Sequence, residues 1–221
     1  MKSDNFFPYI RPAVSDQKVL QRSQDFHDQM QSRRSLRFFS DRPVDQKVIE
    51  NLIMTASSAP SGAHKQPWTF CAVSDSEMKS KIREAAEKEE YISYNGRMSD
   101  EWLKDLEPFG TDWHKPFLEI APWLIILFKK AYDLNEDGSR AKNYYVNESV
   151  GIAAGFLISA IHQAGLVTLT HTPSPMNFLQ ELLGRPENER PFLLLPVGHP
   201  AKDAVVPELH RKGLDGVSVF Y

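Results

Sequence analysis

Apolar residues gather in four short runs along the chain, at residues 68–73, 121–129, 167–170 and 192–197. Each run is far shorter than a membrane span, and a short continuous apolar run is typical of a buried strand. The second run is almost unbroken, so it predicts the central strand of a sheet.

Outside these runs, apolar residues recur at intervals of three and four, a spacing that predicts amphipathic helices. The spacing marks residues 19–32, the segment that Asp45 can cap, and residues 141–164 and 175–184. The helix at 141–164 is apolar or small on nearly every side. We therefore expect it to lie at the domain centre or at a subunit interface.

Both ends of the chain carry apolar residues that need a surface to pack on. An arm at residues 1–18 contains Phe6, Phe7 and Tyr9, and a strand-like tail ends at residues 217–221. Each end packs either on its own subunit or on a partner chain.

Residues 76–107 are highly charged and yet carry a thin apolar stripe. Glu90 and Tyr94 stand four apart and share one helical face, and Asn95-Gly96 offers a hinge or a helix end. One interpretation is a solvated helical hairpin. The other is a lid that becomes ordered over a ligand, which would cover residues 76–116 of a single domain spanning 1–221.

Composition fits an ordinary soluble globular protein. Its 221 residues can bury a sizeable core, and a net charge of −3, from 26 basic and 29 acidic side chains, disfavours a general nucleic-acid binder. The single cysteine, Cys71, lies in an apolar run and fits a reducing compartment. With no signal-peptide core at the N-terminus, we expect a soluble cytoplasmic protein.

A basic stretch at residues 33–37, Arg-Arg-Ser-Leu-Arg, precedes two phenylalanines. If it is extended, Arg33, Ser35 and Arg37 share one face, while Leu36 and Phe38 anchor the other face in a core. Two guanidinium groups and a hydroxyl would then face one anion, because planar guanidinium groups match phosphate oxygens in pairs. The alternative is a solvated basic turn with surface ion pairs.

A second stretch, residues 56–64, combines small residues with Pro and Gly. Such a sequence marks a tight loop that another body can approach closely. A flat ligand, a partner subunit or ordinary turn chemistry would each account for it.

Sequence templates for a dinucleotide fold, a phosphate-binding P-loop, a zinc protease and a paired-cysteine metal site are all absent. The seven histidines show no metal-ligand spacing. We therefore expect no metal.

The stretches 33–37, 59–64 and 66–70 resemble the flavin-binding half of the nitroreductase superfamily. Further motifs at 87–98, 164–168, 182–186, 194–198 and 211–212 resemble the iodotyrosine deiodinase branch, so the similarity covers about residues 20–215. The resemblance implies an α+β fold with a central mixed β-sheet flanked by helices. It also implies an intertwined homodimer with exchanged terminal segments and FMN at the subunit interface.

The resemblance assigns roles to particular residues of this chain. Thr172 would be catalytic and donate a hydrogen bond to the flavin N5 atom, Pro60 and Ser61 would reach the flavin from the partner chain, and the backbone N–H of Ala63 would meet the phenolate oxygen of the substrate. The full FMN-binding set is Arg33, Arg34, Ser35, Leu36, Arg37, Pro60, Ser61, Thr170, His171, Thr172 and Arg211. The substrate-binding set is Ala63, Glu90, Tyr94 and Lys115.

The implied activity is reductive dehalogenation of halotyrosines, which turns 3-iodo-L-tyrosine into L-tyrosine and iodide. A free amino acid carries both charges, so a closing lid needs an anion, Glu90, and a cation, Lys115. Burying either charge without a partner would be costly. NAD(P)H or a reductase is a possible electron source, although no nicotinamide motif is visible.

Three departures from the family pattern stand out. His171 replaces the middle one of three consecutive threonines, and Asn95-Gly96 replaces bulkier residues near the lid hinge. Animal members begin with a membrane anchor that this sequence lacks, so we expect a soluble, bacterial-type member.

Other functions remain open from the sequence. The protein could be a broad NAD(P)H-dependent nitro or quinone reductase, which needs no zwitterion clamp, or a relative of the enzyme that consumes flavin to make the lower ligand of cobalamin. A non-enzymatic flavoprotein that binds halotyrosine is a further alternative. Glu90 and Lys115 could also be ordinary surface ion-pair residues.

Overall fold

The computed structural model describes residues 6–221, which form two units that meet in the chain at Arg33 and Arg34. The N-terminal unit contains an extended segment at residues 6–15 and helix α1 (Asp16–Ser32), as the apolar spacing predicts. Residues 1–5 of the predicted arm lie outside the described part of the chain.

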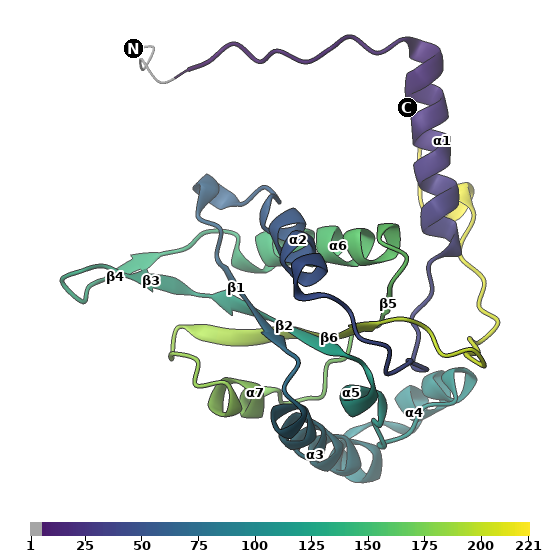
Figure 1. The fold of residues 1–221 in the computed structure, drawn as a ribbon, viewed down its shortest axis with the longest axis vertical. Coiled ribbons are helices and arrows are strands. Elements are labelled where there is room, and N and C mark those ends of the chain that lie inside the picture. Colours follow the sequence, from purple (N-terminus) through teal and green to yellow (C-terminus); the bar gives the residue numbers. More distant parts are fainter. Residues whose placement is uncertain (1–5) are drawn as a thin grey trace. The chain divides into compact units, whose positions relative to one another are not determined.

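The second unit is built on a four-stranded sheet whose strands have the order β1-β2-β6-β5 (Figure 1). Neighbouring strands pair antiparallel, so the sheet is antiparallel rather than mixed as predicted; Ser35 adds an isolated parallel bridge to Thr168 at its edge. A two-stranded hairpin projects beyond the sheet (Figure 1). The strands are β1 (Trp68–Val73), β2 (Trp123–Lys130), β3 (Tyr132–Leu134), β4 (Arg140–Lys142), β5 (Val167–Thr168) and β6 (Glu189–Gly198).

Helices cover both faces of the sheet, with α2 and α6 on one face and α3, α5 and α7 on the other (Figure 1). Their bounds are α2 (Gln46–Ser57), α3 (Ser76–Ile92), α5 (Phe117–Ile120), α6 (Val146–Gln163) and α7 (Asn177–Leu182). Alternate residues of β2 point to opposite faces, so Leu124, Ile126 and Phe128 enter the core under α3, α5 and α7. Ile125 and Leu127 enter the cores under α2 and α6. This is the α+β arrangement that the sequence predicts.

The segment between α3 and α5 alternates between short helices and irregular chain. It contains the π-helix η2 (Ser93–Arg97), helix α4 (Asp100–Leu106) and the short 3-10 helix η3 (Glu107–Phe109). Asp75 caps α3 and Ser99 caps α4 through their side-chain oxygens. Gly110 then reverses the chain with φ of 55°, a conformation that favours glycine.

One sequence prediction about the end of an element is wrong, and another is not tested by a single chain. The helix predicted from residue 141 begins at Val146, because residues 140–142 pair with β3 in the hairpin. The tail at 217–221 is not a strand in the described chain, where only η4 (Leu214–Gly216) forms near it. A strand needs a pairing edge, and the tail meets none in this single chain.

Helix α6 is not buried on every side in the single chain. Ile152 and Phe156 are 43% and 40% exposed, whereas Val150, Ala153 and Leu157 are fully buried. Among residues 6–221, no helix combines the length and the apolar character that crossing a membrane requires.

Candidate active site

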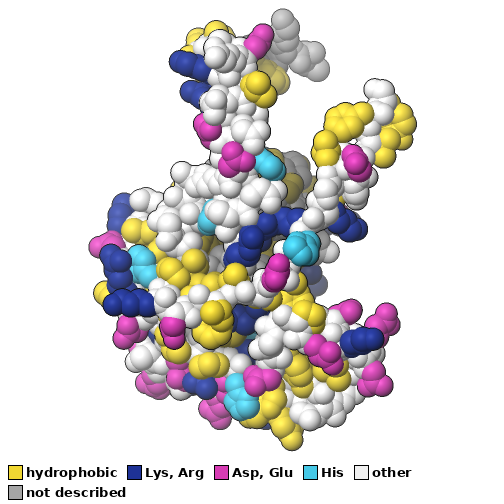
Figure 2. Space-filling view, turned by 90° about the vertical axis from the view of Figure 1, so that its right-hand side faces the viewer, with side chains coloured by type: hydrophobic (Ala, Val, Ile, Leu, Met, Phe, Trp, Pro, Cys, Tyr) yellow, Lys and Arg dark blue, Asp and Glu magenta, His cyan; other side chains and the backbone are white. Residues whose placement is uncertain are grey.

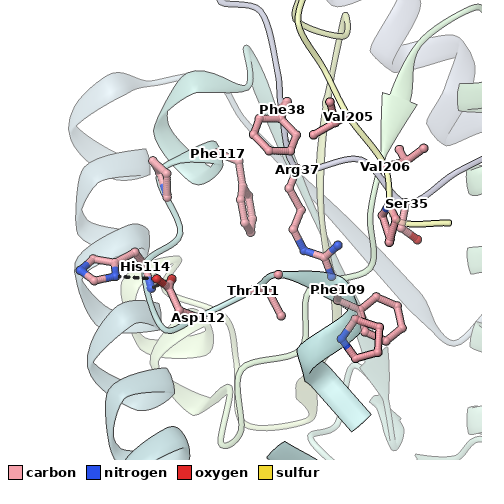
Figure 3. A pocket seen from close by; sticks show the side chains of 14 residues that line it. Ser35, Arg37, Phe38, Phe109, Thr111, Asp112, His114, Phe117, Val205 and Val206 are labelled. Carbon is pink, nitrogen blue, oxygen red and sulfur yellow. Dashed lines mark hydrogen bonds and ion pairs between the residues drawn. The ribbon is translucent and has the colours of Figure 1, made fainter. Parts of the chain in front are cut away.

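A cavity of about 540 Å³ lies between the basic stretch, the segment before α5 and the chain after β6 (Figure 3). Arg37 reaches over Phe109, with its guanidinium carbon 5.9 Å from the ring centre. In the space-filling view, Lys and Arg side chains gather around a hollow beside hydrophobic side chains (Figure 2). The lining comprises Ser35, Arg37, Phe38, Pro108, Phe109, Gly110, Thr111, Asp112, His114, Pro116, Phe117, Val205, Val206 and Pro207.

Only one of the two predicted anchors of the basic stretch, Leu36, is buried. Leu36 is buried, and its N–H donates to the Thr168 carbonyl at 3.2 Å. Phe38 is 47% exposed and lines the cavity, while Phe39 is 5% exposed and packs in the core. The prediction of Phe38 as an anchor is therefore wrong. Ser35 and Phe39 form isolated bridges with Thr168 and Pro200, and no continuous strand joins them. Side chains between the two bridges therefore do not alternate strictly between the two faces.

The structure brings Ser35 and Arg37 together at the cavity. Burial lowers the pKa of Arg37, with a smaller opposing effect of Tyr94. Arg34 is exposed on the same stretch, and Arg33 belongs to the N-terminal unit. Arg211 lies on the exposed chain that follows the cavity-lining residues 205–207.

Glu90, Tyr94 and Lys115 form one cluster beside the cavity. The Lys115 Nζ atom lies 3.6 Å from Glu90 Oε2, and the two side chains are only 5% and 11% exposed. It also lies 5.5 Å from the centre of the Tyr94 ring and donates to the Asp112 carbonyl. The Tyr94 hydroxyl donates to the Thr111 carbonyl at 3.3 Å, so helix α3, η2 and the segment before α5 meet here.

Burial disfavours the charged form of both residues of the Glu90–Lys115 pair. It raises the pKa of Glu90, an effect that Lys115 opposes. It lowers the pKa of Lys115, an effect that Glu90 opposes and that Arg37 reinforces. A buried pair with a third charge nearby is a site suited to a charged ligand.

Thr170, His171 and Thr172, which follow β5 after Leu169, point to alternate sides. Thr170 and Thr172 are exposed, and His171 between them is buried. The His171 N–H donates to the Leu194 carbonyl at 2.8 Å, and the Leu194 N–H returns a bond of 3.1 Å. This pairing keeps the segment extended and turns the imidazole away from the two threonine side chains.

The imidazole of His171 lies at the buried side of the site. Its ring meets the Phe117 ring edge-on with centroids 5.6 Å apart, and its Nε2 atom has no hydrogen-bond partner. Burial, followed by the charges of Lys115 and Arg37, lowers its pKa to about 3. The ring is therefore neutral at physiological pH.

The small-residue loop after α2 forms a separate part of the predicted site. Ala63 and His64 have φ of 49° and 55°, and the Ser61 hydroxyl accepts a hydrogen bond from the Gln66 N–H at 2.9 Å. A Cβ on Gly62 would lie 2.8 Å from the Tyr144 carbonyl oxygen, so the chain passes close to the residues before α6. In the described chain, Pro60, Ser61 and Ala63 do not line the cavity.

Sequence reasoning missed several residues of the site. Phe109, Asp112 and Phe117 line the cavity, and Glu87 holds the backbone of Lys115. The Glu87–Lys115 contact joins residues 28 apart in the sequence, so no local pattern signals it. Within residues 6–221, no group of three His, Cys, Asp or Glu side chains could hold a metal ion.

The chain is similar to known proteins in sequence. The model of the nitroreductase family matches residues 30–199. The iodotyrosine deiodinase of Haliscomenobacter hydrossis is 65% identical over 216 residues, which cover 98% of this chain and 97% of that protein. Iodotyrosine deiodinase 1 of Homo sapiens is 45% identical over 213 residues, which cover 96% of this chain and 74% of that protein.

Solved structures show the same fold. A crystal structure of oxidized iodotyrosine deiodinase bound to FMN and 3-iodo-L-tyrosine matches with a TM-score of 0.75 and 28% identity, covering 88% of this chain and all of that chain. A nitroreductase with bound FMN from Bacteroides fragilis matches with a TM-score of 0.66 and 18% identity, over 89% and 99% of the two chains. The second match concerns the fold alone.

Proposed function

This chain belongs to the nitroreductase family, and from that membership we propose that it removes halide reductively from halotyrosines with FMN as cofactor. The reaction turns 3-iodo-L-tyrosine into L-tyrosine and iodide, with two electrons and one proton consumed for each carbon–iodine bond broken. The observation that carries the proposal is the buried cluster of Glu90, Tyr94 and Lys115 beside the cavity.

The residues present fit FMN. The basic stretch offers the guanidinium groups and the Ser35 hydroxyl that a phosphate and a ribityl chain need. Thr170 and Thr172 are exposed on one side of their segment, where Thr172 can donate to the flavin N5 atom. Arg33, Arg34, Arg37 and Arg211 complete the proposed cation set. When bound, FMN supplies the electrons for the reduction.

Glu90 and Lys115 bind the two ends of an amino acid. Glu90 accepts the substrate ammonium and Lys115 holds its carboxylate, so each buried charge gains a partner of opposite sign. Tyr94 joins η2 to Thr111 and closes this side of the site. Helix α3, the first part of the predicted lid 76–116, contributes Ile82 and Ala86 to the core. The remainder, residues 93–116, acts as the lid and excludes water from the substrate when it closes.

We propose a homodimer in which the small-residue loop comes from the partner subunit. Pro60 and Ser61 then reach the flavin, and the Ala63 N–H meets the phenolate oxygen. One feature supports this arrangement: α6 exposes Ile152 and Phe156 beside its two glycines. NAD(P)H or a separate reductase supplies the electrons.

A titration of the flavin-loaded protein with 3-iodo-L-tyrosine tests the function. We expect quenching of flavin fluorescence on binding and iodide release when the flavin is reduced. Glu90→Gln should weaken iodotyrosine binding about a hundredfold, because Lys115 then lacks its anionic partner and the ammonium its acceptor charge. Glu84→Gln, an exposed position on the same helix, is the matched control. Turnover of nitroaromatics without iodide release would contradict the proposal.

A further inference from the structure

We propose that Glu87 is a positioning residue of the substrate clamp, and that its carboxylate fixes the backbone of Lys115 so that the Lys115 ammonium faces Glu90. This inference rests on the proposed function, since it assigns a task to a residue behind the clamp. The Glu87 carboxylate is bonded to the backbone of Lys115 and to Arg83, so its effect on the clamp runs through Lys115.

The contact is short and charge-assisted. The Glu87 Oε1 atom accepts a hydrogen bond from the backbone N–H of Lys115 at 2.6 Å. The same oxygen accepts a second bond from Arg83 Nε at 2.8 Å. Glu87 is 17% exposed, so solvent competes weakly for its oxygens. A bond of this kind is about twice as strong as one between neutral groups.

The backbone of Lys115 depends on this acceptor. Lys115 comes just before Pro116, the N-cap of α5, so its N–H lies outside the hydrogen-bond ladder of that helix. A buried N–H needs a partner elsewhere. Glu87 supplies that partner from helix α3, 28 residues away in the sequence.

Glu87 belongs to a row of charged residues on α3 that face the segment from Lys115 to Ala121. Lys79 Nζ donates to the carbonyls of Glu119 and Ala121, both at 2.9 Å, and Arg83 Nη1 lies 3.2 Å from Glu119 Oε2. The row is Lys79, Arg83, Glu87 and Glu90, whose spacings of four, four and three place them on one face of the helix. The first two members hold α5 and its C-terminal end, and Glu87 holds the chain at its N-terminal end.

A fixed backbone matters because the Lys115 side chain is long and flexible. Its four rotatable bonds lose entropy when the ammonium is held in one place. With the backbone fixed, the ammonium is already placed 3.6 Å from Glu90 before a ligand binds. Without Glu87, part of the binding free energy of the substrate would be spent on ordering Lys115.

Two variants of Glu87 separate positioning from a purely structural role. Glu87→Ala removes the acceptor, and Glu87→Gln keeps an oxygen for the Lys115 N–H. We expect Glu87→Ala to raise the dissociation constant of 3-iodo-L-tyrosine about tenfold, and Glu87→Gln to stay within about threefold of wild type. The dissociation constant of FMN should not change in either variant. Glu77→Ala, whose carboxylate is 78% exposed on the same helix, is the matched control.

Hydrogen–deuterium exchange of the ligand-free protein tests the backbone contact without any substrate. Peptides that cover residues 111–118 should exchange faster in Glu87→Ala than in wild type, Glu87→Gln or Glu77→Ala. Unchanged exchange and unchanged iodotyrosine affinity in Glu87→Ala would overturn the inference, as would an equal loss of FMN and iodotyrosine affinity. Faster exchange in a protein whose wild type does not bind iodotyrosine would instead count against the proposed function.

Discussion

His171 is a buried imidazole whose Nε2 atom has no partner, beside two cations. Burial, together with the charges of Lys115 and Arg37, lowers its pKa to about 3. In the folded protein His171 therefore stays neutral at pH values where the unfolded chain, with the ordinary pKa of 6.5, is protonated. Its neutral form is compatible with folding, and its charged form is not.

This difference gives His171 a measurable effect on stability at acidic pH. Below pH 6.5 the unfolded state binds one more proton, so the free energy of unfolding falls by about 1.4 kcal/mol for each pH unit until about pH 3. Between pH 7.5 and 5.0, wild type should lose about 2 kcal/mol more than His171→Gln, which cannot titrate. Urea unfolding of both proteins at the two pH values measures the difference, and equal losses would contradict the assignment.

The sequence predicted which residue types belong to the site better than it predicted their directions. The resemblance placed Thr170, His171 and Thr172 in the FMN-binding set, with His171 as a departure from the family pattern. Backbone pairing with Leu194 turns the imidazole to the side opposite the two threonine side chains. The sequence pattern also predicted a buried Phe38 where the structure buries Phe39. Direction depends on where backbone pairing begins and ends, and a short stretch of sequence does not contain that information.

At the scale of elements, the π-helix η2 is fastened to the loop that follows Thr172. Arg97 Nη1 donates to the Ser174 carbonyl at 2.9 Å and to Glu89 Oε2 at 2.7 Å. The Ser93 hydroxyl donates to the same carbonyl at 3.4 Å. Movement of the lid segment is therefore tied to the backbone two residues beyond Thr172.

Arg97→Ala should loosen the lid segment without unfolding the sheet. Arg97 is 45% exposed, so its contacts are worth about 1 kcal/mol, equivalent to about a fivefold change in a local opening equilibrium. Hydrogen–deuterium exchange should rise by about that factor in peptides from residues 93–110 and stay unchanged in β2. Lys104→Ala, an exposed change on α4, is the control. Equal exchange in both variants would show that Arg97 does not hold η2.

Most elements were predictable because their apolar spacing is local. Helix α2 begins after Asp45, and strand β1 spans Trp68–Val73, as predicted. The hairpin of β3 and β4 was missed because its strands are three residues long and largely polar. The boundary of α6 was wrong for the same reason, since residues 140–142 carry no apolar pattern of their own.

At the scale of the whole molecule, one chain holds the predicted site in two separate groups. Arg37 lines the cavity, and Tyr94 and Lys115 of the clamp bond to its lining residues Thr111 and Asp112. The loop containing Ala63 instead faces the residues before α6. The family resemblance assigned both groups to one ligand, which is why we propose a homodimer. The resemblance already brought Pro60 and Ser61 of this loop from the partner chain.

A homodimer should therefore depend on the exposed face of α6. Phe156→Glu would place a carboxylate in an apolar contact with no partner, which costs several kcal/mol of association free energy. We expect sedimentation analysis to show a monomer, and FMN affinity to fall sharply because each flavin would lose the loop of the partner. Leu134→Glu makes the same kind of change on the β3–β4 hairpin, at a residue that is 59% exposed, and should leave the assembly intact. A Phe156→Glu dimer with normal FMN affinity would place the subunit interface elsewhere, and the route by which Ala63 reaches the substrate would then have to avoid α6.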